Sequence, residues 1–459
     1  MTFLRSLLFN LLFFAFTGAA LVGCLPLVPL LDRAGRLALM AWWAERVLVL
    51  LRLTVGIRLR VTGAEHLPGA GPALIAAKHQ SAFDTIVWLA LLPRPTYVLK
   101  RELMRIPLYG WHARAGGMIA VDRADRHFFP PSLLWLMVGQ RAMKDFTRPL
   151  SRLVGRGVDF RQGSVTRMDP ARRTVEIDGR PLSADALVIA LGAEYAPEAI
   201  PGLAQAGLCI YTMDGASAVH DALASFRGGR IVILTAVPQY KCPAAPYEAA
   251  LLVDAWLRKR GVRDRATIDF YAAEPQPMVV AGPGVGAAVR SMIEARGVAY
   301  HPEHQVKEVD PAGRRIGFAN GATAEFDLLL YVPPHRAPAV VREAGLSNEA
   351  GWIPVDRHTL QTPFEGVFAL GDITTIPLKM GRPLPKAGVF AHAQAKVVAH
   401  NIARQWTGKG EPRRFTGEGM CFIEAGGSRA GLGKGNFYAE PTPRVAMHPP
   451  GLLWHAGKV

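Results

Sequence analysis

The stretch Gly116–Pro130 (GGMIAVDRADRHFFP) constrains the fold most, because the sequence changes character on its two sides. The apolar run Met118–Val121 predicts a short strand that ends in an acid and a base, Asp122 and Arg123. A charged strand end is typical of a ligand site at the edge of a sheet. We therefore expect a join at about residues 121–124, with part of a different protein on each side.

Composition narrows the class of partner. The 459 residues give room for roughly three domains, and the net charge of +16 favours an anionic partner. Because the basic residues are scattered and no nucleic-acid module is visible, we expect lipid headgroups and no nucleic acid. The four cysteines, at 24, 209, 242 and 421, form no CxxC pair, which argues against a zinc site or a disulfide scaffold.

The amino-terminal segment predicts a membrane partner. Leu7–Leu31 carries no charge and is long enough to span a bilayer, although two prolines disturb its last turns. The alternative is a signal peptide with a lipoprotein-like cleavage box at Leu21–Cys24. Leu37–Leu53 mixes tryptophan and charged residues with apolar ones, which suits either an interfacial helix or a buried core helix. We expect residues 1–55 to associate with a bacterial-type inner membrane.

The first block that carries candidate catalytic residues is KHQSAFD, which lies between a predicted strand at Ala73–Ala77 and an apolar helix through Leu92. His79 would lie in the loop, and Asp84 in the first helical turn could reach back toward it. A histidine held by a carboxylate can take the proton from an attacking hydroxyl. Ser81 and Asp84 also read as an ordinary helix capping box that needs no catalysis.

Residues 1–123 resemble the glycerolipid acyltransferases, specifically the 1-acyl-glycerol-3-phosphate acyltransferases. The resemblance is carried by the H-x4-D block that begins at His79 and by GMIAVDR, which ends at Arg123. It implies that His79 activates the hydroxyl of lysophosphatidate, that Asp84 orients His79, and that Arg123 helps to hold the phosphate. The acyl donor would be a carrier thioester. Because the family's later E-G-T-R block is absent, we expect only a partial domain over residues 56–123, with weak or no acyl transfer.

Farther on, two apolar strands end in glycine turns. Ala186–Leu191 leads into Gly192, and the run VFAL leads into Gly371 and Asp372, an acid that could accept from a ribityl hydroxyl. Lys386 then precedes a helix predicted to reach about residue 405. A helix N-terminus with a lysine is a positive pole that suits the charge of a reduced isoalloxazine. The alternative is a buried strand followed by a capped helix.

The strand predicted at Ile231–Ala236 is followed by VPQYKCPAAPYE, where a nicotinamide enzyme would carry G-x-G-x-x-G. Prolines remove amide donors, and tyrosine and lysine side chains block the close approach of a pyrophosphate, so NADH is disfavoured as electron donor. Cys242 stands beside Lys241 and near a helix start, two features that lower the pKa of a thiol. The alternative is a small core residue.

Together these blocks resemble the flavoprotein disulfide-reductase superfamily, and within it the sulfide:quinone oxidoreductases and flavocytochrome c sulfide dehydrogenases. The matching runs are VDRADRHFFPPS, DALVIALGAEYAP, KCPAAPYE, TPFEGVFALGD, LPKAGVFAHAQAKVVAHNI and CFIEAGGSRAG. The resemblance implies FAD held by Asp122 at the adenosine ribose, by Gly192, and by Gly371 and Asp372 at the ribityl chain. It also implies that Cys242 takes up sulfide sulfur and forms an adduct with the flavin. Electrons would pass to a quinone or a haem protein.

Two family features have no obvious counterpart. The opening strand with G-x-G-x-x-G is absent before Asp122. Loss of two or three charge-assisted hydrogen bonds, at about 1.5–3 kcal/mol each, would weaken FAD binding at least about a hundredfold. The partner of Cys242 is expected near the Gly371 turn, where this chain has ITTI, and the sequence leaves the later Cys421 unplaced.

The predicted fold class is α/β: a partial acyltransferase-like segment with an N-terminal membrane helix, joined to a truncated flavoprotein with two Rossmann-like domains. We expect an oxidoreductase region over 124–459, with its FAD part at 124–200 and 320–410, a second Rossmann-like part at 205–319, and a C-terminal part at 411–459. The leading functional hypothesis is a sulfide-oxidising FAD enzyme. The alternatives are a lysophosphatidate acyltransferase and an inactive chimeric product.

Overall fold

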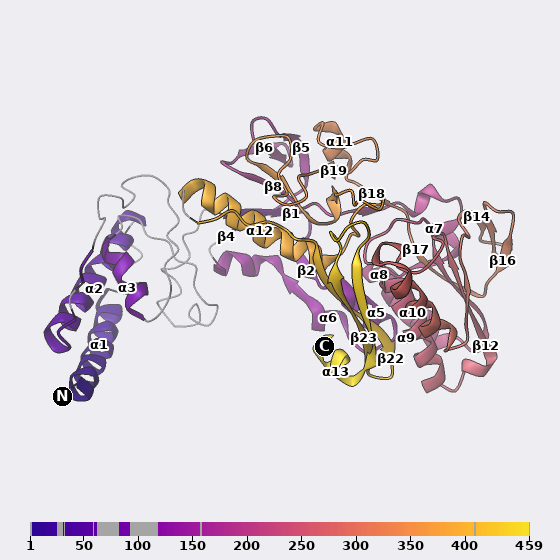
Figure 1. Ribbon diagram of the computed structural model, residues 1–459, viewed down its shortest axis with the longest axis horizontal. Coiled ribbons are helices and arrows are strands. Elements are labelled where there is room, and N and C mark those ends of the chain that lie inside the picture. The colour runs from indigo at the N-terminus through magenta and orange to yellow at the C-terminus, as the bar shows by residue number, and fades with distance from the viewer. Residues whose placement is uncertain are drawn as a thin grey trace. The chain divides into compact units, whose positions relative to one another are not determined.

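The computed structural model describes residues 2–24, 31, 33–57, 59–61, 82–91, 118–156, 158–407 and 410–458. The chain divides into two compact units, each described by itself (Figure 1). Unit 1 comprises Met1–Asp125, Leu150–Gln162 and Ala403–Pro412, and unit 2 comprises Arg126–Pro149, Gly163–Ile402 and Arg413–Val459.

Three helices form the first part of unit 1: α1 (Thr2–Cys24), α2 (Arg33–Thr54) and α3 (Ala82–Leu91). They share a small apolar core, and the indole nitrogen of Trp43 donates to the hydroxyl of Thr17 at 3.3 Å. Among the described residues, no helix combines the length and the apolar character needed to cross a membrane. The transmembrane helix predicted from Leu7 is therefore not found, and α1 ends at Cys24, before the two prolines.

The strand at the predicted join is confirmed. β1 (Met118–Asp122) pairs in parallel with β4 (Val158–Gln162), and Asp122 stands opposite Gln162. In the part of the chain that the structure describes, these two strands form a sheet of their own. The strand predicted at Ala73–Ala77 lies outside the described residues.

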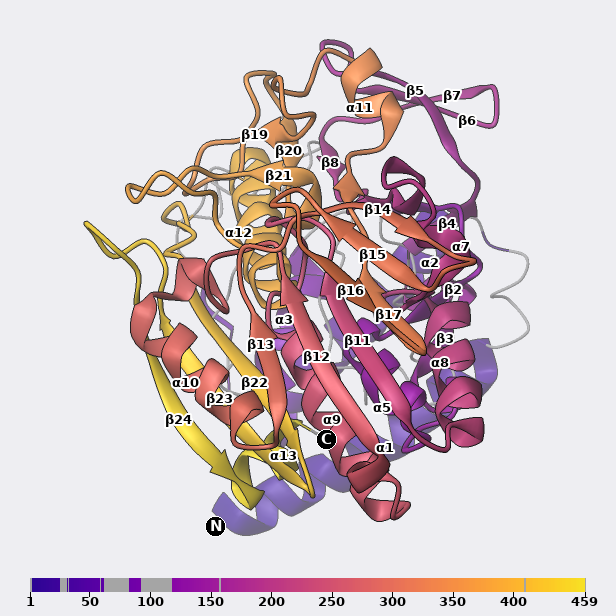
Figure 2. The ribbon, with the colours of Figure 1, turned by 90° about the vertical axis from the view of Figure 1, so that its right-hand side faces the viewer.

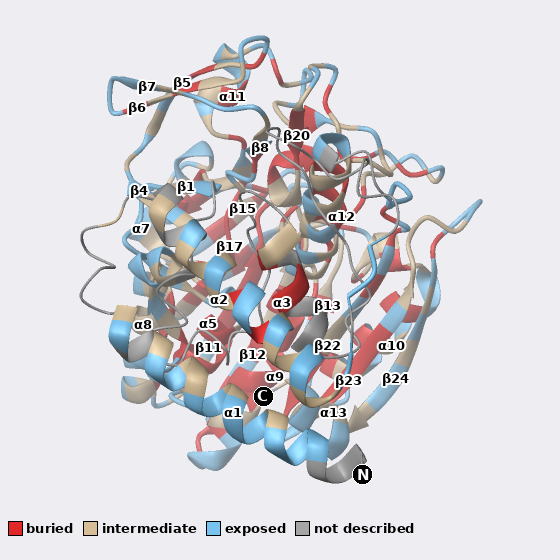
Figure 3. Cartoon of the chain, turned by 90° about the vertical axis from the view of Figure 1, so that its left-hand side faces the viewer, coloured by how far each residue is buried: buried red, intermediate tan, exposed pale blue. Residues whose placement is uncertain are grey.

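Unit 2 is built on a sheet of five parallel strands in the order β10–β17–β11–β12–β13. Figure 2 shows β17, β11, β12 and β13 side by side. Their bounds are β10 Leu208–Cys209, β17 Leu328–Val332, β11 Gly229–Thr235, β12 Ala266–Ala272 and β13 Val298–His301. The strand predicted at Ile231–Ala236 is thus confirmed as β11. Its run of apolar residues is fully buried, as expected of a central parallel strand that is covered on both faces (Figure 3).

Alternation along β11 separates the two faces of this sheet. Ile231 and Ile233 point toward the helices α8 (Met213–Ser225), α9 (Ala245–Lys259) and α10 (Pro283–Glu294), whereas Val232 and Leu234 point toward an antiparallel sheet. That sheet consists of β14 Val306–Asp310, β15 Arg315–Phe318 and β16 Thr323–Glu325. The result is a layered α/β domain in which helices cover one face of the parallel sheet and a small antiparallel sheet covers the other.

The two predicted glycine-turn strands also form and pair with each other. β8 (Leu187–Ile189) lies parallel to β20 (Val367–Ala369), and Phe368 packs against α12 (Gly388–Thr407). The chain ends in an antiparallel meander with a short last helix: β22 Glu418–Gly426, β23 Arg429–Asn436, β24 Arg444–Gly451 and α13 Leu452–Lys458.

The remaining elements are short. They are β2 Arg126–Phe128, α5 Leu133–Met137, α6 Met143–Phe146, β3 Thr147–Pro149, β5 Val165–Asp169, β6 Thr174–Ile177, β7 Arg180–Ser183, β9 Glu194–Tyr195, α7 Leu203–Ala206, β18 His335–Arg336, α11 Ala339–Glu343, β19 Ile353–Pro354 and β21 Thr374–Thr375.

One buried carboxylate provides a test of how unit 2 is held together. Asp254 on α9 is fully buried and pairs with Arg263 at 2.6 Å, Arg258 at 2.9 Å and Arg296 at 3.5 Å. Replacing it by asparagine leaves guanidinium groups without their counter-charge, so Asp254→Asn should lower the free energy of unfolding by about 3 kcal/mol. Urea unfolding followed by circular dichroism measures this change.

The matched control is Glu294→Gln, which removes an exposed partner of Arg290. Because water screens that pair, the change should stay below about 1 kcal/mol. Equal effects of the two substitutions would contradict the structural role of Asp254.

Candidate active site

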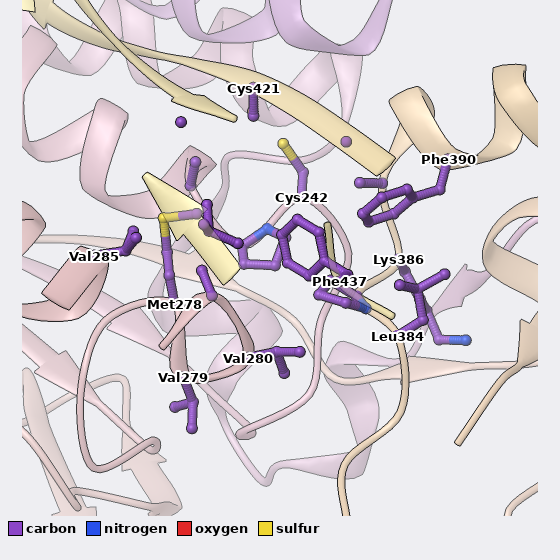
Figure 4. Close-up of a pocket in the computed structure, with 18 of the residues that line it drawn as sticks. Cys242, Met278, Val279, Val280, Val285, Leu384, Lys386, Phe390, Cys421 and Phe437 are labelled. Atoms are coloured by element: carbon purple, nitrogen blue, oxygen red, sulfur yellow. The ribbon is translucent and has the colours of Figure 1, made fainter. Parts of the chain in front are cut away.

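A cavity of about 130 Å³ lies within unit 2, bordered by the loop after β11, the segment before α12 and the C-terminal meander (Figure 4). Its lining is mainly apolar, and the side chains include Met278, Val279, Val280, Val285, Leu384, Phe390 and Phe437. Among these apolar groups stand two cysteines, Cys242 and Cys421, together with Glu274 and Lys386. A mostly apolar pocket with a few convergent reactive groups is the usual form of a small-molecule site.

Cys242 occupies the loop between β11 and α9 in an unusual backbone conformation. Its φ of 51° is left-handed, which costs a residue with a side chain about 1–2 kcal/mol. The amide of Cys242 donates to the carbonyl oxygen of Lys386 at 2.7 Å, and the Tyr211 hydroxyl donates to the carbonyl oxygens of Lys241 and Cys242 at 2.8 and 3.1 Å. These bonds fix the loop so that the cysteine faces the cavity.

Cys421 reaches the same cavity from β22. Figure 4 shows the sulfur atom of Cys242 pointing toward Cys421. The sequence analysis left Cys421 unplaced and expected the partner of Cys242 near the Gly371 turn. The fold brings the two cysteines into one lining, and both are free thiols.

The expectation of a low thiol pKa at Cys242 is wrong. Burial raises the pKa of Cys242, and the nearby Cys421 and Glu248 raise it further, while Lys458 opposes the shift. Burial likewise raises the pKa of Cys421 to about 12. Desolvation therefore outweighs the local effect that a neighbouring lysine and a helix start predict. In the reduced state both sulfur atoms carry a proton at neutral pH.

Two acids lie next to the cysteine pair, and the last helix pairs with both. Glu248 is 4% exposed, forms an ion pair with Lys458, and accepts the amide of Glu424 at 2.7 Å. Glu424 is 1% exposed and lies 3.0 Å from Nδ1 of His455. Both partners come from α13, so this last helix supplies the polar groups that hold the two acids beside the cavity. Sequence reasoning missed this contact, because charged residues near a chain end read as solvated.

The two predicted glycine turns meet at one edge of the β8–β20 pair. The amide of Leu370 donates to the carbonyl oxygen of Ile189 at 3.0 Å, and parallel strands bring their carboxyl ends to the same side. Gly192 and Gly371 both adopt left-handed φ values, 70° and 75°. A Cβ atom built at Gly192 would meet no heavy atom within 4 Å, so the backbone there borders open space.

Buried charges gather beside these turns. Burial raises the pKa of Asp372, although Lys241 and Lys386 pull it down. Burial also lowers the pKa of Lys386 to about 8, while its ammonium group donates to the carbonyl oxygens of Asp372 and Thr374 at 2.7 and 2.9 Å. The Lys241 ammonium lies 4.7 Å from the ring centre of Tyr195. The cluster holds two cations against one acid.

His335 is the neutral member of this cluster. Its Nδ1 lies 2.8 Å from the carbonyl oxygen of Pro333, so Nδ1 carries the proton and Nε2 presents a lone pair. Nε2 is buried and has no hydrogen-bond partner. Burial, aided by Lys241 and Lys386, lowers the pKa of His335 to about 4. The imidazole is therefore an acceptor ready for a donor group.

The residues around the turns fit a flavin. Gly192 leaves its backbone accessible, whereas a Cβ atom built at Gly371 would lie 3.2 Å from Ala391. Lys386 supplies positive charge, and His335 offers an unsatisfied acceptor. A flavin ring carries both an N–H donor and carbonyl acceptors, and it becomes anionic on reduction. The predicted cofactor residues Gly192, Gly371, Asp372 and Lys386 all belong to unit 2.

The other predicted site residues lie elsewhere. Asp122 ends β1 in unit 1 and Arg123 follows it. The Asp122 carboxylate accepts a hydrogen bond from the amide of Ala124 at 2.9 Å. His79 lies outside the described residues. Asp84 is in α3, and its side chain is outside the description. Their proposed roles therefore stay predictions.

Two family models match the chain. The model described as pyridine nucleotide-disulphide oxidoreductase matches residues 113–395, and the model described as acyltransferase matches residues 58–151. The two matches overlap at the predicted join, which supports a fusion of two different segments.

Two sulfide:quinone oxidoreductases match most of the chain. A mitochondrial sulfide:quinone oxidoreductase of Mus musculus is 26% identical over 343 residues, which cover 71% of this chain and 74% of that protein. The crystal structure of the sulfide:quinone oxidoreductase from Aquifex aeolicus is 25% identical with a TM-score of 0.67, covering 74% of this chain and 82% of that chain. The predicted architecture with two dinucleotide-binding domains is thereby confirmed.

The amino-terminal part matches a different enzyme. A 1-acyl-sn-glycerol-3-phosphate acyltransferase of Pseudomonas aeruginosa is 36% identical over 83 residues, which are 18% of this chain and 32% of that protein. This chain thus spans about a third of that relative's length.

The pKa of His335 generates a pH test. Because the imidazole titrates near 4 in the folded chain and near 6.5 in the unfolded chain, its contribution to stability is fully present above pH 6.5 and is lost as the pH falls toward 4. His335→Phe should remove about 2–3 kcal/mol of this acid destabilisation. Urea unfolding at pH 7 and pH 4 measures it.

His127→Phe is the control, since this exposed side chain keeps its contact with water in both states. If His335→Phe left the acid destabilisation as large as in the parent chain, the assignment of a buried, neutral His335 would be wrong.

Proposed function

The chain belongs to the pyridine nucleotide-disulphide oxidoreductase family, and we propose that it is an FAD-dependent oxidoreductase that oxidises sulfide and passes the electrons to a quinone. The observation that carries this proposal is the shared cavity, which Cys242 and Cys421 line together with Lys386. The family is named for the exchange of electrons through a cysteine pair, and two cysteines in one apolar lining can supply that exchange.

The cysteine pair performs the sulfur chemistry. In the oxidised state, hydrosulfide attacks the Cys242 sulfur of a Cys242–Cys421 disulfide, the S–S bond breaks, and Cys242 becomes a persulfide. Cys421 leaves as a thiolate and, with a pKa of about 12, takes up a proton from water. A second hydrosulfide removes the outer sulfur as hydrogen disulfide, which leaves the dithiol. Two sulfide sulfur atoms have then joined, and the dithiol holds the two electrons.

A bound flavin would accept these two electrons as the disulfide re-forms, and would hand them to the acceptor. Gly192, Gly371 and Asp372 would hold it, and Lys386 would stabilise the negative charge of its reduced form. His335 would accept a hydrogen bond through Nε2. The apolar lining suits a quinone ring better than a nucleotide, because it offers few donors for phosphate.

We further propose that α1 and α2 attach the chain to the inner membrane of a bacterium. Both helices expose large apolar side chains, with Phe14 71%, Leu11 64% and Leu53 76% exposed. Apolar side chains of this size gain free energy by entering the acyl layer. The net charge of +16 adds attraction to anionic headgroups.

The test is anaerobic mixing of the FAD-loaded chain with sulfide, with the flavin absorbance followed by stopped flow. Sulfide should bleach the flavin, and a water-soluble quinone should restore the colour. Cys242→Ser and Cys421→Ser should each abolish bleaching by sulfide, because neither serine can form the disulfide. Dithionite should still bleach both variants.

Cys24→Ser is the control, because Cys24 belongs to unit 1. A protein that binds no FAD, or a Cys421→Ser variant that sulfide reduces as fast as the parent, would contradict the proposal. If a haem protein but no quinone restored the colour, the electron acceptor would be a haem protein and not a quinone.

A second candidate function is acyl transfer to lysophosphatidate by residues 56–123, supported by the acyltransferase match at residues 58–151. His79 would act as the base, Asp84 would orient it, and Arg123 would hold the phosphate. Membranes that contain the chain should acylate lysophosphatidate from an acyl carrier thioester, and His79→Ala should remove that activity. Equal acylation with and without His79 would instead leave this segment without catalytic function, as in a chimeric product.

A further inference from the structure

Glu274 is a buried acid that the sulfur chemistry above does not use. It follows β12, is 2% exposed and borders the cavity. Its carboxylate accepts three hydroxyl hydrogen bonds: from Tyr240 at 2.5 Å and Tyr247 at 2.7 Å on Oε1, and from Thr235 at 2.8 Å on Oε2. An acid buried this deeply is normally paired with a cation, yet here hydroxyl groups satisfy it.

The two tyrosines stand on either side of Cys242 in the sequence. Tyr240 belongs to the loop before the cysteine, and Tyr247 lies in the first turns of α9 after it. One oxygen atom of Glu274 therefore binds a tyrosine on each side of Cys242. The segment between β11 and α9, which carries Cys242, is the cysteine loop. Thr235, the last residue of β11, bonds the other oxygen and also accepts the amide of Ala273 at 3.1 Å. The loop is thus tied to the ends of both β11 and β12.

The cysteine loop requires such an anchor. The left-handed φ of Cys242 is unfavourable for a residue with a side chain, and it persists only where the surroundings enforce it. The bonds from Tyr211 and to Lys386 hold the backbone of the cysteine itself. The bonds to Glu274 hold the residues on each side, and stacking of Tyr247 on Phe270, with ring centres 4.7 Å apart, fixes the second of them.

The same hydrogen bonds occupy Glu274 where another protein of this fold could use the acid to bind a nucleotide. In dinucleotide-binding domains, an acid at the end of the second strand commonly accepts the ribose hydroxyls of a nucleotide. Here tyrosine and threonine hydroxyls occupy both carboxylate oxygens. The acid therefore serves the cysteine loop in place of a nicotinamide nucleotide, in line with the sequence-based expectation that NADH is disfavoured.

We propose that Glu274 is a positioning residue, which holds Cys242 against Cys421 by anchoring Tyr240 and Tyr247 on one carboxylate oxygen. The proposal rests on the proposed function in one respect, namely that Cys242 and Cys421 act as a pair. It predicts that the anchor works through hydrogen-bond acceptance, so an uncharged acceptor of the same shape can replace it.

The test measures the equilibrium between the Cys242–Cys421 dithiol and its disulfide in glutathione buffers, by mass spectrometry of the alkylated full-length protein. Glu274→Ala and the double variant Tyr240→Phe/Tyr247→Phe should each make the disulfide at least about tenfold less favourable, equivalent to about 30 mV. Glu274→Gln keeps an oxygen acceptor for both tyrosines and should stay within about threefold of the parent.

Tyr271→Phe is the matched control. This tyrosine also belongs to β12, but its ring packs on the opposite side with His301 and Phe318. Removing its hydroxyl should leave the equilibrium unchanged. If Glu274→Ala does not fold, Tyr240→Phe alone tests the proposal, because it deletes only one hydroxyl from the loop. It should shift the equilibrium between dithiol and disulfide in the same direction, by a smaller factor.

Two results would overturn the proposal. One is a parent-like equilibrium in the double tyrosine variant. The other is a Glu274→Gln variant as impaired as Glu274→Ala, which would show that the charge or the proton of Glu274 matters and not its position. Neither readout uses sulfide or quinone, so a chain without sulfide activity can still support the anchor, and failure of the anchor leaves the sulfide test unaffected.

If the parent forms no disulfide in any buffer, the alkylation rate of Cys242 tests whether Glu274 anchors the loop. Release of the loop would expose the thiol and lower its raised pKa, so Glu274→Ala should react about tenfold faster for each unit of that fall. An unchanged rate would contradict the anchor.

Discussion

The hydrogen bond from the Cys242 amide to the Lys386 carbonyl oxygen joins the two parts of the site on which the rest depends. Cys242 lies in the loop between α9 and β11, and β11 belongs to the five-stranded sheet. Lys386 precedes α12, which packs on the β8–β20 pair. The bond therefore fixes the loop that carries Cys242 against the segment that carries Lys386. The left-handed backbone at Cys242 shows that the chain accepts local strain to keep this contact.

Electrostatics divides this region into two environments. Around the cysteines, burial keeps the thiols protonated, and the Glu248–Lys458 pair adds little net charge. Beside the glycine turns, Lys241 and Lys386 outnumber Asp372. Electrons that leave a neutral dithiol for a cationic surrounding gain stabilisation as negative charge develops there, while the two protons of the dithiol are released. In the proposed function, this arrangement would favour transfer of electrons from the cysteine pair toward the glycine turns.

Sequence reasoning succeeded where local pattern decides the outcome. The apolar run at Ile231–Ala236, the run VFAL and the helix after Lys386 all formed, because burial and strand alternation are encoded within a few residues. The join near Asp122 was visible because two unlike patterns meet there. It lies within the overlap of the two family matches.

The same reasoning failed where tertiary contacts decide. Cys421 reaches Cys242 only through the C-terminal meander, and Lys458 reaches Glu248 across 210 positions of sequence, so no local pattern could pair them. The low pKa expected of Cys242 followed from its neighbours in sequence, whereas the cavity around it raises that pKa. Glu274 was overlooked because its three hydroxyl partners come from β11, the cysteine loop and α9.

The central claim is that Cys242 and Cys421 form one redox unit with a flavin. Anaerobic titration of the oxidised, FAD-loaded chain with dithionite tests it most directly, by counting the electrons taken up per flavin. The account predicts two electrons for the flavin and two more for the disulfide, with the second pair absent in Cys421→Ser. Uptake of only two electrons by the parent chain would contradict it.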